Sequence, residues 1–130
     1  MHANEALIRD GYAAMVRGDG RPLAALLTPQ TQWIICGSGH LAGTYTGPDE
    51  IFGLWKAIAA QTGGGLDLEI RDVLANDERA VVLVTARGER SGRILEERQI
   101  AVFELAHDST VSSATFIYEH PDAYDAFWED

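Results

Sequence analysis

A glutamate and a histidine end the last apolar run of this chain. Glu119 and His120 follow the stretch VSSATFIY and stand directly before Pro121. The ordinary pKa of a histidine is about 6.5, so its ring can accept or donate a proton near neutral pH. The pair is therefore the first candidate for proton-transfer chemistry. The alternative is structural, because a histidine before a proline commonly just ends a strand.

Alternation along this run separates the two residues. Neighbouring residues of a strand point to opposite faces, so His120 shares a face with Phe116 and Tyr118, and Glu119 takes the other face. The aromatic face is the better candidate to line a pocket. We therefore predict His120 as the catalytic base and rank Glu119 below it.

The same alternation selects a polar group on the preceding strand. Gln99 shares its parity with Phe103, whereas Arg98 has the opposite parity. A phenylalanine in an apolar strand is expected to face inward. We therefore predict Gln99 as a ligand-binding group and expect Arg98 to point towards solvent or a partner subunit.

Aromatic side chains from several segments are expected to meet in the same pocket. Ligand pockets are mostly apolar and carry a few polar groups that orient the ligand. The alternative is that these rings simply fill the core. The predicted ligand-contacting aromatic residues are Trp33, Trp55, Phe103, Phe116 and Tyr118.

The spacing of the candidate residues does not fit metal binding, a serine nucleophile or phosphate binding. Cys36 and His40 are isolated, so no metal cluster of histidines and cysteines is expected. The sequence around Ser38 lacks the Gly-x-Ser-x-Gly spacing of a nucleophile elbow. The glycines at 63–65 precede a strand, so they offer no helix N-terminus to a phosphate. We expect neither a metal nor a cofactor.

Helices and a sheet must position these residues. Helical spacing of apolar residues predicts helices early in the chain, and alternating or β-branched runs between short turns predict strands later. Strands joined by short turns are antiparallel neighbours, and helices must cover their apolar face, which gives an α+β fold. The expected helices span 3–18, 22–27 and 48 to the glycines at 63–65; the expected strands span 32–36, 66–71, 80–87, 94–105 and 111–118.

Length and charge restrict the class of protein. A chain of 130 residues is expected to form one domain, residues 1–130, with a core that needs no disulfide. Its 20 acidic and 10 basic residues give a net charge of −10. This charge argues against nucleic acid and anionic membrane as partners. Because no apolar run approaches the length of a membrane span, the expected location is the cytoplasm.

Three segments resemble the SnoaL-like family of the nuclear transport factor two-like superfamily. They are LAGTYTGPDEI at 41–51, DVLANDERAVVLV at 72–84 and DAYDAFW at 122–128, within an order of elements that spans nearly the whole chain. The resemblance implies a cone-like fold, in which helices from the N-terminal half cover a curved antiparallel or mixed sheet. It also implies an internal pocket for a small hydrophobic molecule and a homodimer formed through the sheet.

The resemblance leaves the activity open, since this fold supports many functions. Ketosteroid isomerases in the superfamily hold an oxyanion with a tyrosine of the first helix, and Tyr12 matches that position. Their base and their second acid have no counterpart in Cys36–Gly39 and Arg98–Val102, so we reject that specific activity.

Two hypotheses therefore stand. One is an isomerase, cyclase or dehydratase that moves a proton on a carbonyl compound, with His120 as the base and Tyr12 or Gln99 as the oxyanion donor. The other is a non-catalytic ligand-binding or dimerisation module with the same fold.

Overall fold

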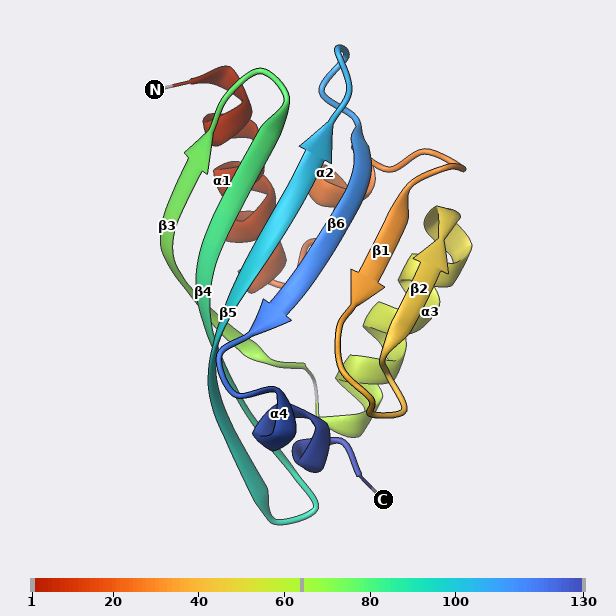
Figure 1. Cartoon of the computed structure of the whole chain (residues 1–130), viewed down its shortest axis with the longest axis vertical. Coiled ribbons are helices and arrows are strands. Elements are labelled where there is room, and N and C mark those ends of the chain that lie inside the picture. Colours follow the sequence, from red (N-terminus) through yellow and green to blue (C-terminus); the bar gives the residue numbers. More distant parts are fainter. Residues whose placement is uncertain (1, 64, 130) are drawn as a thin grey trace.

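A six-stranded mixed sheet and four helices form the computed structural model, which describes residues 2–63 and 65–129 (Figure 1). Gly64, the middle glycine of the stretch 63–65, lies outside the described residues. The helices are α1 (Ala3–Val16), α2 (Arg21–Ala24), α3 (Gly47–Gln61) and α4 (Pro121–Phe127). The strands are β1 (Gln32–Ile35), β2 (Gly43–Thr46), β3 (Asp67–Ala75), β4 (Arg79–Arg90), β5 (Arg93–Leu105) and β6 (Val111–Tyr118).

The order of the strands in the sheet is β2-β1-β6-β5-β4-β3. β1 and β6 are parallel, and every other neighbouring pair is antiparallel. The long β4–β5 ladder places Gln99 opposite Val84, and the β5–β6 ladder places it opposite Tyr118. Residues that are far apart in sequence are thus fixed side by side on one face of the sheet.

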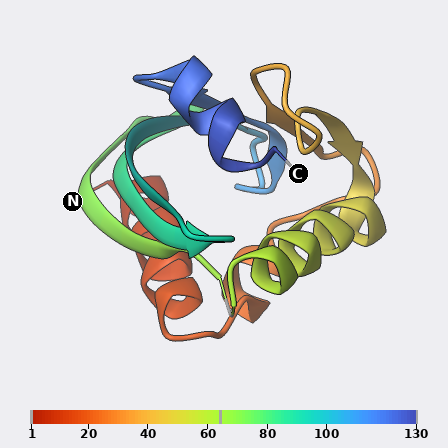
Figure 2. The ribbon, with the colours of Figure 1, turned by 90° about the horizontal axis from the view of Figure 1, so that it is seen from below.

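The sheet bends around a concave face that the helices close. Seen from below, the strands form an arc, with α1 and α3 along its open side and α4 over the other end (Figure 2). A bulge between Ile70 and Asp72 shifts the register of β3 against β4. Bulges of this kind increase local twist and bend a strand. The bend gives the concave face room for more than one layer of side chains.

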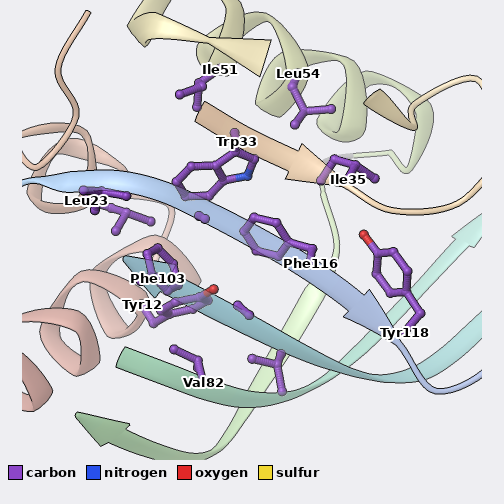
Figure 3. Packing of buried hydrophobic residues seen from close by; sticks show 14 of the residues in the cluster. Tyr12, Leu23, Trp33, Ile35, Ile51, Leu54, Val82, Phe103, Phe116 and Tyr118 are labelled. Carbon is purple, nitrogen blue, oxygen red and sulfur yellow. The ribbon is translucent and has the colours of Figure 1, made fainter. Parts of the chain in front are cut away.

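Aromatic and aliphatic side chains fill the concave face. Figure 3 shows Trp33 and Phe116 next to Phe103, with Tyr12 of α1 against the Phe103 ring. The centroids of these rings lie 5.0 Å apart for Trp33 and Phe116 and 6.0 Å apart for Tyr12 and Phe103. The Tyr12–Phe103 contact is edge-to-face and the Trp33–Phe116 contact is tilted; aromatic contacts of this kind stabilise a core beyond simple area burial.

Two elements were not expected from the sequence. The stretch between the expected strand at 32–36 and the expected helix from 48 contains the short edge strand β2, whose residues are mostly exposed. The chain after β6 forms a complete helix, α4, which begins with Pro121 in its first turn. No helix of the part of the chain that the structure describes has the length and apolar character needed to cross a membrane.

Candidate functional site

An aromatic cavity of about 340 Å³ lies between the concave face of the sheet and the helices. This volume is at the small end of the range for ligand pockets. Its mouth lies beside the end of α1, where Val16 and Gly18 are exposed lining residues. The lining combines the aromatic residues Tyr12, Trp33, Trp55, Phe116, Tyr118 and Tyr124, the amide Gln99, and aliphatic residues that include Ile35, Ile58, Leu66 and Leu68.

Tyr12 brings a phenol into this lining from α1. Only 2% of the residue is exposed, and its ring is held against Phe103. Its hydroxyl has no hydrogen-bond partner among residues 2–63 and 65–129. Burial raises the pKa of Tyr12 above its ordinary value, because the phenolate would be poorly solvated. At neutral pH the Tyr12 hydroxyl is therefore a neutral group that can donate a hydrogen bond.

Gln99 supplies the second polar group of the lining. It lies on β5 between Val84 and Tyr118, on the same face as the fully buried Phe103. Its carboxamide, like the Tyr12 hydroxyl, makes no hydrogen bond to the described protein. A carboxamide presents both a donor and an acceptor. The arrangement can therefore bind an oxygen of a ligand from two sides.

Tyr118 and Tyr124 close the end of the cavity that faces α4. Their rings stack with a centroid separation of 3.6 Å and an interplanar angle of 11°. Burial is the main cause that raises the pKa of both phenols. Tyr124 was not predicted as a lining residue. The stretch DAYDAFW gave a usable signal, since Tyr124 and Phe127 have the spacing of a helix face.

Asp125 fastens α4 to the loop after β1. One carboxylate oxygen of Asp125 accepts hydrogen bonds from the backbone N–H and the hydroxyl of Ser38, and the other accepts from the N–H of Gly39. Gly37 has a φ of 115°, and a Cβ there would lie 2.5 Å from an Asp125 oxygen. The glycine-rich loop thus folds around the carboxylate and holds α4, with Tyr124, in place.

His120 lies outside the cavity, so the prediction that its ring lines the pocket is wrong. Strand β6 ends at Tyr118, and the chain turns through Glu119 and His120 into α4, which removes the strand alternation on which the prediction rested. The His120 side chain is 64% exposed. It borders a polar depression on the outer side of the sheet, together with Arg98 and Glu119.

A buried carboxylate that was not predicted lies beside His120. Glu97 is 2% exposed, and its Oε1 accepts the His120 backbone N–H at 3.0 Å and lies 3.2 Å from His120 Nδ1. The parity that selects Gln99 also selects Glu97, so the signal was present. It was missed because the charged stretch ERSGRILEER is typical of a solvated hairpin tip.

Phe103 forms part of the wall behind the cavity and is not a lining residue. It is 0% exposed and contacts the rings of Tyr12, Trp33 and Phe116. Its expected position facing the ligand is therefore corrected to a position in the core. The structure brings together the other predicted residues, Tyr12, Trp33, Trp55, Gln99, Phe116 and Tyr118.

The cavity offers hydrogen bonds and apolar contacts. None of the described lining residues is a carboxylate, a histidine, a lysine or an arginine. In the same ranges of the chain, no group of three His, Cys, Asp or Glu side chains could hold a metal ion. The described lining thus presents hydrogen-bonding groups and apolar surface without a charged side chain.

The bent mixed sheet with helices over its concave face defines an α+β fold that several solved structures share. The protein Bal32a from a soil-derived mobile gene cassette matches with a TM-score of 0.90 and 28% identity, over 97% of this chain and 96% of that one. A putative SnoaL-like polyketide cyclase from Jannaschia sp. CCS1 matches with a TM-score of 0.74 and 13% identity, over 100% and 97%. The second likeness shows the fold alone.

The SnoaL-like domain family matches residues 8–114, and the chain belongs to this family. An uncharacterized protein of Mycobacterium tuberculosis strain H37Rv, Rv0034, is 29% identical over 123 residues, which are 94% of this chain and 93% of the relative. The resemblance predicted from the sequence is thereby confirmed.

Proposed function

We propose that the protein binds a small hydrophobic molecule in its cavity and holds one ligand oxygen with Tyr12 and Gln99. The observation that carries the proposal is that both polar groups line an aromatic cavity without a partner from the described protein. Neither polar group is among the fully buried unpaired atoms of the described residues, so water can reach both from the cavity. A ligand that displaces this water must replace its hydrogen bonds, because an unpaired buried group costs about 1–3 kcal/mol. A ligand carbonyl or hydroxyl can do so, whereas a purely aliphatic ligand cannot.

Proton transfer on a carbonyl compound is the second candidate. A neutral Tyr12 hydroxyl is suited to stabilise the negative charge that develops on an enolising carbonyl oxygen. The described lining holds no carboxylate or histidine as a base, which is why binding comes first. His120 stays the predicted base of this second candidate. Exchange of a ketone's α-protons with deuterium that continues unchanged in His120→Ala would remove it from that role.

Calorimetric titration with 2-acetylnaphthalene tests the binding function. This ketone has two fused rings for the aromatic walls and one oxygen for the two donors. We expect saturable binding, and a loss of about fivefold to tenfold in affinity in Tyr12→Phe and in Gln99→Leu, the usual worth of one hydrogen bond.

Tyr45→Phe is the matched control for the titration. Its hydroxyl donates to the backbone oxygen of Leu41 at 2.7 Å and lies outside the cavity. This variant should bind the ketone as the wild type does. Equal binding by all variants, or no binding by the wild type, would contradict the proposed function.

A homodimer through the outer face of the sheet is part of the proposal. Ile100 and Ile117 form a pair across β5 and β6 on this face and are 41% and 45% exposed. Leu83 pairs with Ile100 on the same face. Exposed apolar surface of this kind commonly marks an interface. The ion pair Arg98–Glu119 borders it with both signs of charge, which suits contact with a second copy.

A further inference from the structure

The charged groups around the cavity are either exposed or already paired. Arg21 contacts Asp19 at 2.9 Å beside the mouth, and Arg17 is exposed at the end of α1. On β5, Arg98 is paired with Glu119, and Glu97, the nearest charged residue of Gln99's parity, is hydrogen-bonded to His120. Within the described ranges, no charged side chain enters the lining. A ligand inside the cavity thus meets hydrogen-bonding groups but no counter-ion.

A cavity without a counter-ion should bind charged ligands more weakly than neutral ones. An ion that enters an apolar cavity loses its hydration, and only a paired charge or several strong hydrogen bonds restore that loss. A ketone, amide or phenol loses much less hydration on entry. Tyr12 and Gln99 can satisfy one oxygen of such a group, because one supplies a donor and the other a donor and an acceptor.

We propose that the cavity selects uncharged ring compounds that carry a ketone, amide or phenol, and rejects carboxylates and ammonium ions of the same size. This selection rests on the proposed binding function and adds the chemical class of the ligand. We assign the charge preference to Gln99, because it supplies the carboxamide on the sheet wall of the cavity, beside Tyr118.

Three probes of nearly equal shape test the selection. They are 2-acetylnaphthalene, 2-naphthoate and 2-(aminomethyl)naphthalene, which are a neutral ketone, an anion and a cation at neutral pH. Calorimetry at one salt concentration should give a dissociation constant at least tenfold larger for each ion than for the ketone. An ion that binds within tenfold of the ketone, or more tightly, would overturn the selection.

The binding function and the selection fail in distinguishable ways. If the ketone binds and one ion binds at the same site with an affinity within tenfold of it, the selection is refuted and the binding function is left intact. Failure of all three probes to bind refutes the binding function and, with it, the selection.

Charge-introducing variants at Gln99 sharpen the test. In Gln99→Lys the new ammonium group should raise the affinity for 2-naphthoate at least tenfold and lower that for 2-(aminomethyl)naphthalene further. Gln99→Glu should raise the affinity for 2-(aminomethyl)naphthalene and lower that for 2-naphthoate. Gln99→Met, which has a side chain of similar size but no charge, should raise the affinity for neither ion. Unchanged ion affinities in folded Gln99→Lys and Gln99→Glu would show that Gln99 does not set the preference. If these variants do not fold, the comparison of the three probes on the wild-type protein decides.

Discussion

The aromatic rings of the concave face either lie within the core or border the cavity, and alanine substitutions in the two groups should lower the free energy of unfolding by different amounts. Phe103 is enclosed by three other rings, whereas Trp55 borders the cavity and is only half-buried. Phe103→Ala should lower the free energy of unfolding by about 3–5 kcal/mol, because the ring leaves a void in packed surroundings. Trp55→Ala should cost about 2 kcal/mol, because part of its surface already faces the cavity. Urea unfolding measures both.

For ligand affinity we expect the opposite order, with a larger loss on substitution of Trp55 than of Phe103. Trp55→Ala should weaken binding of 2-acetylnaphthalene, while Phe103→Leu, a milder change that keeps the protein folded, should leave it within about twofold. Equal losses of binding in both variants would show that Phe103 does contact the ligand.

The ion pair on the outer face predicts a dependence of stability on pH. The hydrogen bond from Arg98, at 2.8 Å, holds the pKa of Glu119 below its ordinary value. A carboxyl group with a lowered folded-state pKa stabilises the fold above its unfolded-state pKa and loses this effect as the pH falls through the folded value. The urea midpoint of Glu119→Gln should therefore lie below that of the wild type at neutral pH and converge with it in acid.

Arg98→Gln supplies the control for this prediction. Since it breaks the same pair, it should show the same convergence, and the double variant should add little to either single change. A difference between wild type and Glu119→Gln that persists unchanged into acid would contradict the assignment.

At the scale of elements, the attachment of α4 depends on one carboxylate. Asp125→Ala removes the acceptor of three hydrogen bonds from Ser38 and Gly39. We expect a loss of about 2 kcal/mol in the free energy of unfolding and faster amide hydrogen exchange throughout α4. Ketone binding should weaken as well, because Tyr124 leaves its place in the lining.

Asp122→Ala tests whether the effect is specific to that carboxylate. Asp122 lies in the first turn of the same helix and is exposed. Loss of its favourable interaction with the helix dipole should cost less than about 1 kcal/mol. Similar hydrogen exchange in both variants would mean that Asp125 has no special role in holding α4.

The sequence predicted the regular elements well where the side-chain pattern was long. The pattern of β6 gave its bounds, Val111–Tyr118, and alternation along β5 placed Gln99 on the concave face. The edge strand β2 escaped because GTYT has four residues with little apolar content, and backbone pairing to β1 forms it. His120 was misplaced because alternation fails where a strand stops, and the turn into α4 depends on distant contacts to Glu97.

At the scale of the whole molecule, the proposed dimer gives a prediction about mass in solution. Ile100→Glu places a charge in the centre of the apolar outer face and should convert a dimer into a monomer. Ile94→Glu changes an even more exposed isoleucine of the same strand near the tip of the β4–β5 hairpin, and it should leave the dimer intact. Light scattering at micromolar concentration measures both. A monomeric wild type would refute the proposal.

The parallel pairing of β1 with β6 has a consequence for synthesis on the ribosome. The ribosome synthesises β1 and β2 early, but these two strands join the rest of the sheet only through β6. The register places Gln32 of β1 beside Ser113 of β6, so the partner strand emerges some 80 residues later. Contacts between segments so far apart in sequence form slowly. A nascent chain stalled before Val111 would hold Trp33 and Ile35 without the strand that covers them, which makes this interval the natural moment for a chaperone to bind.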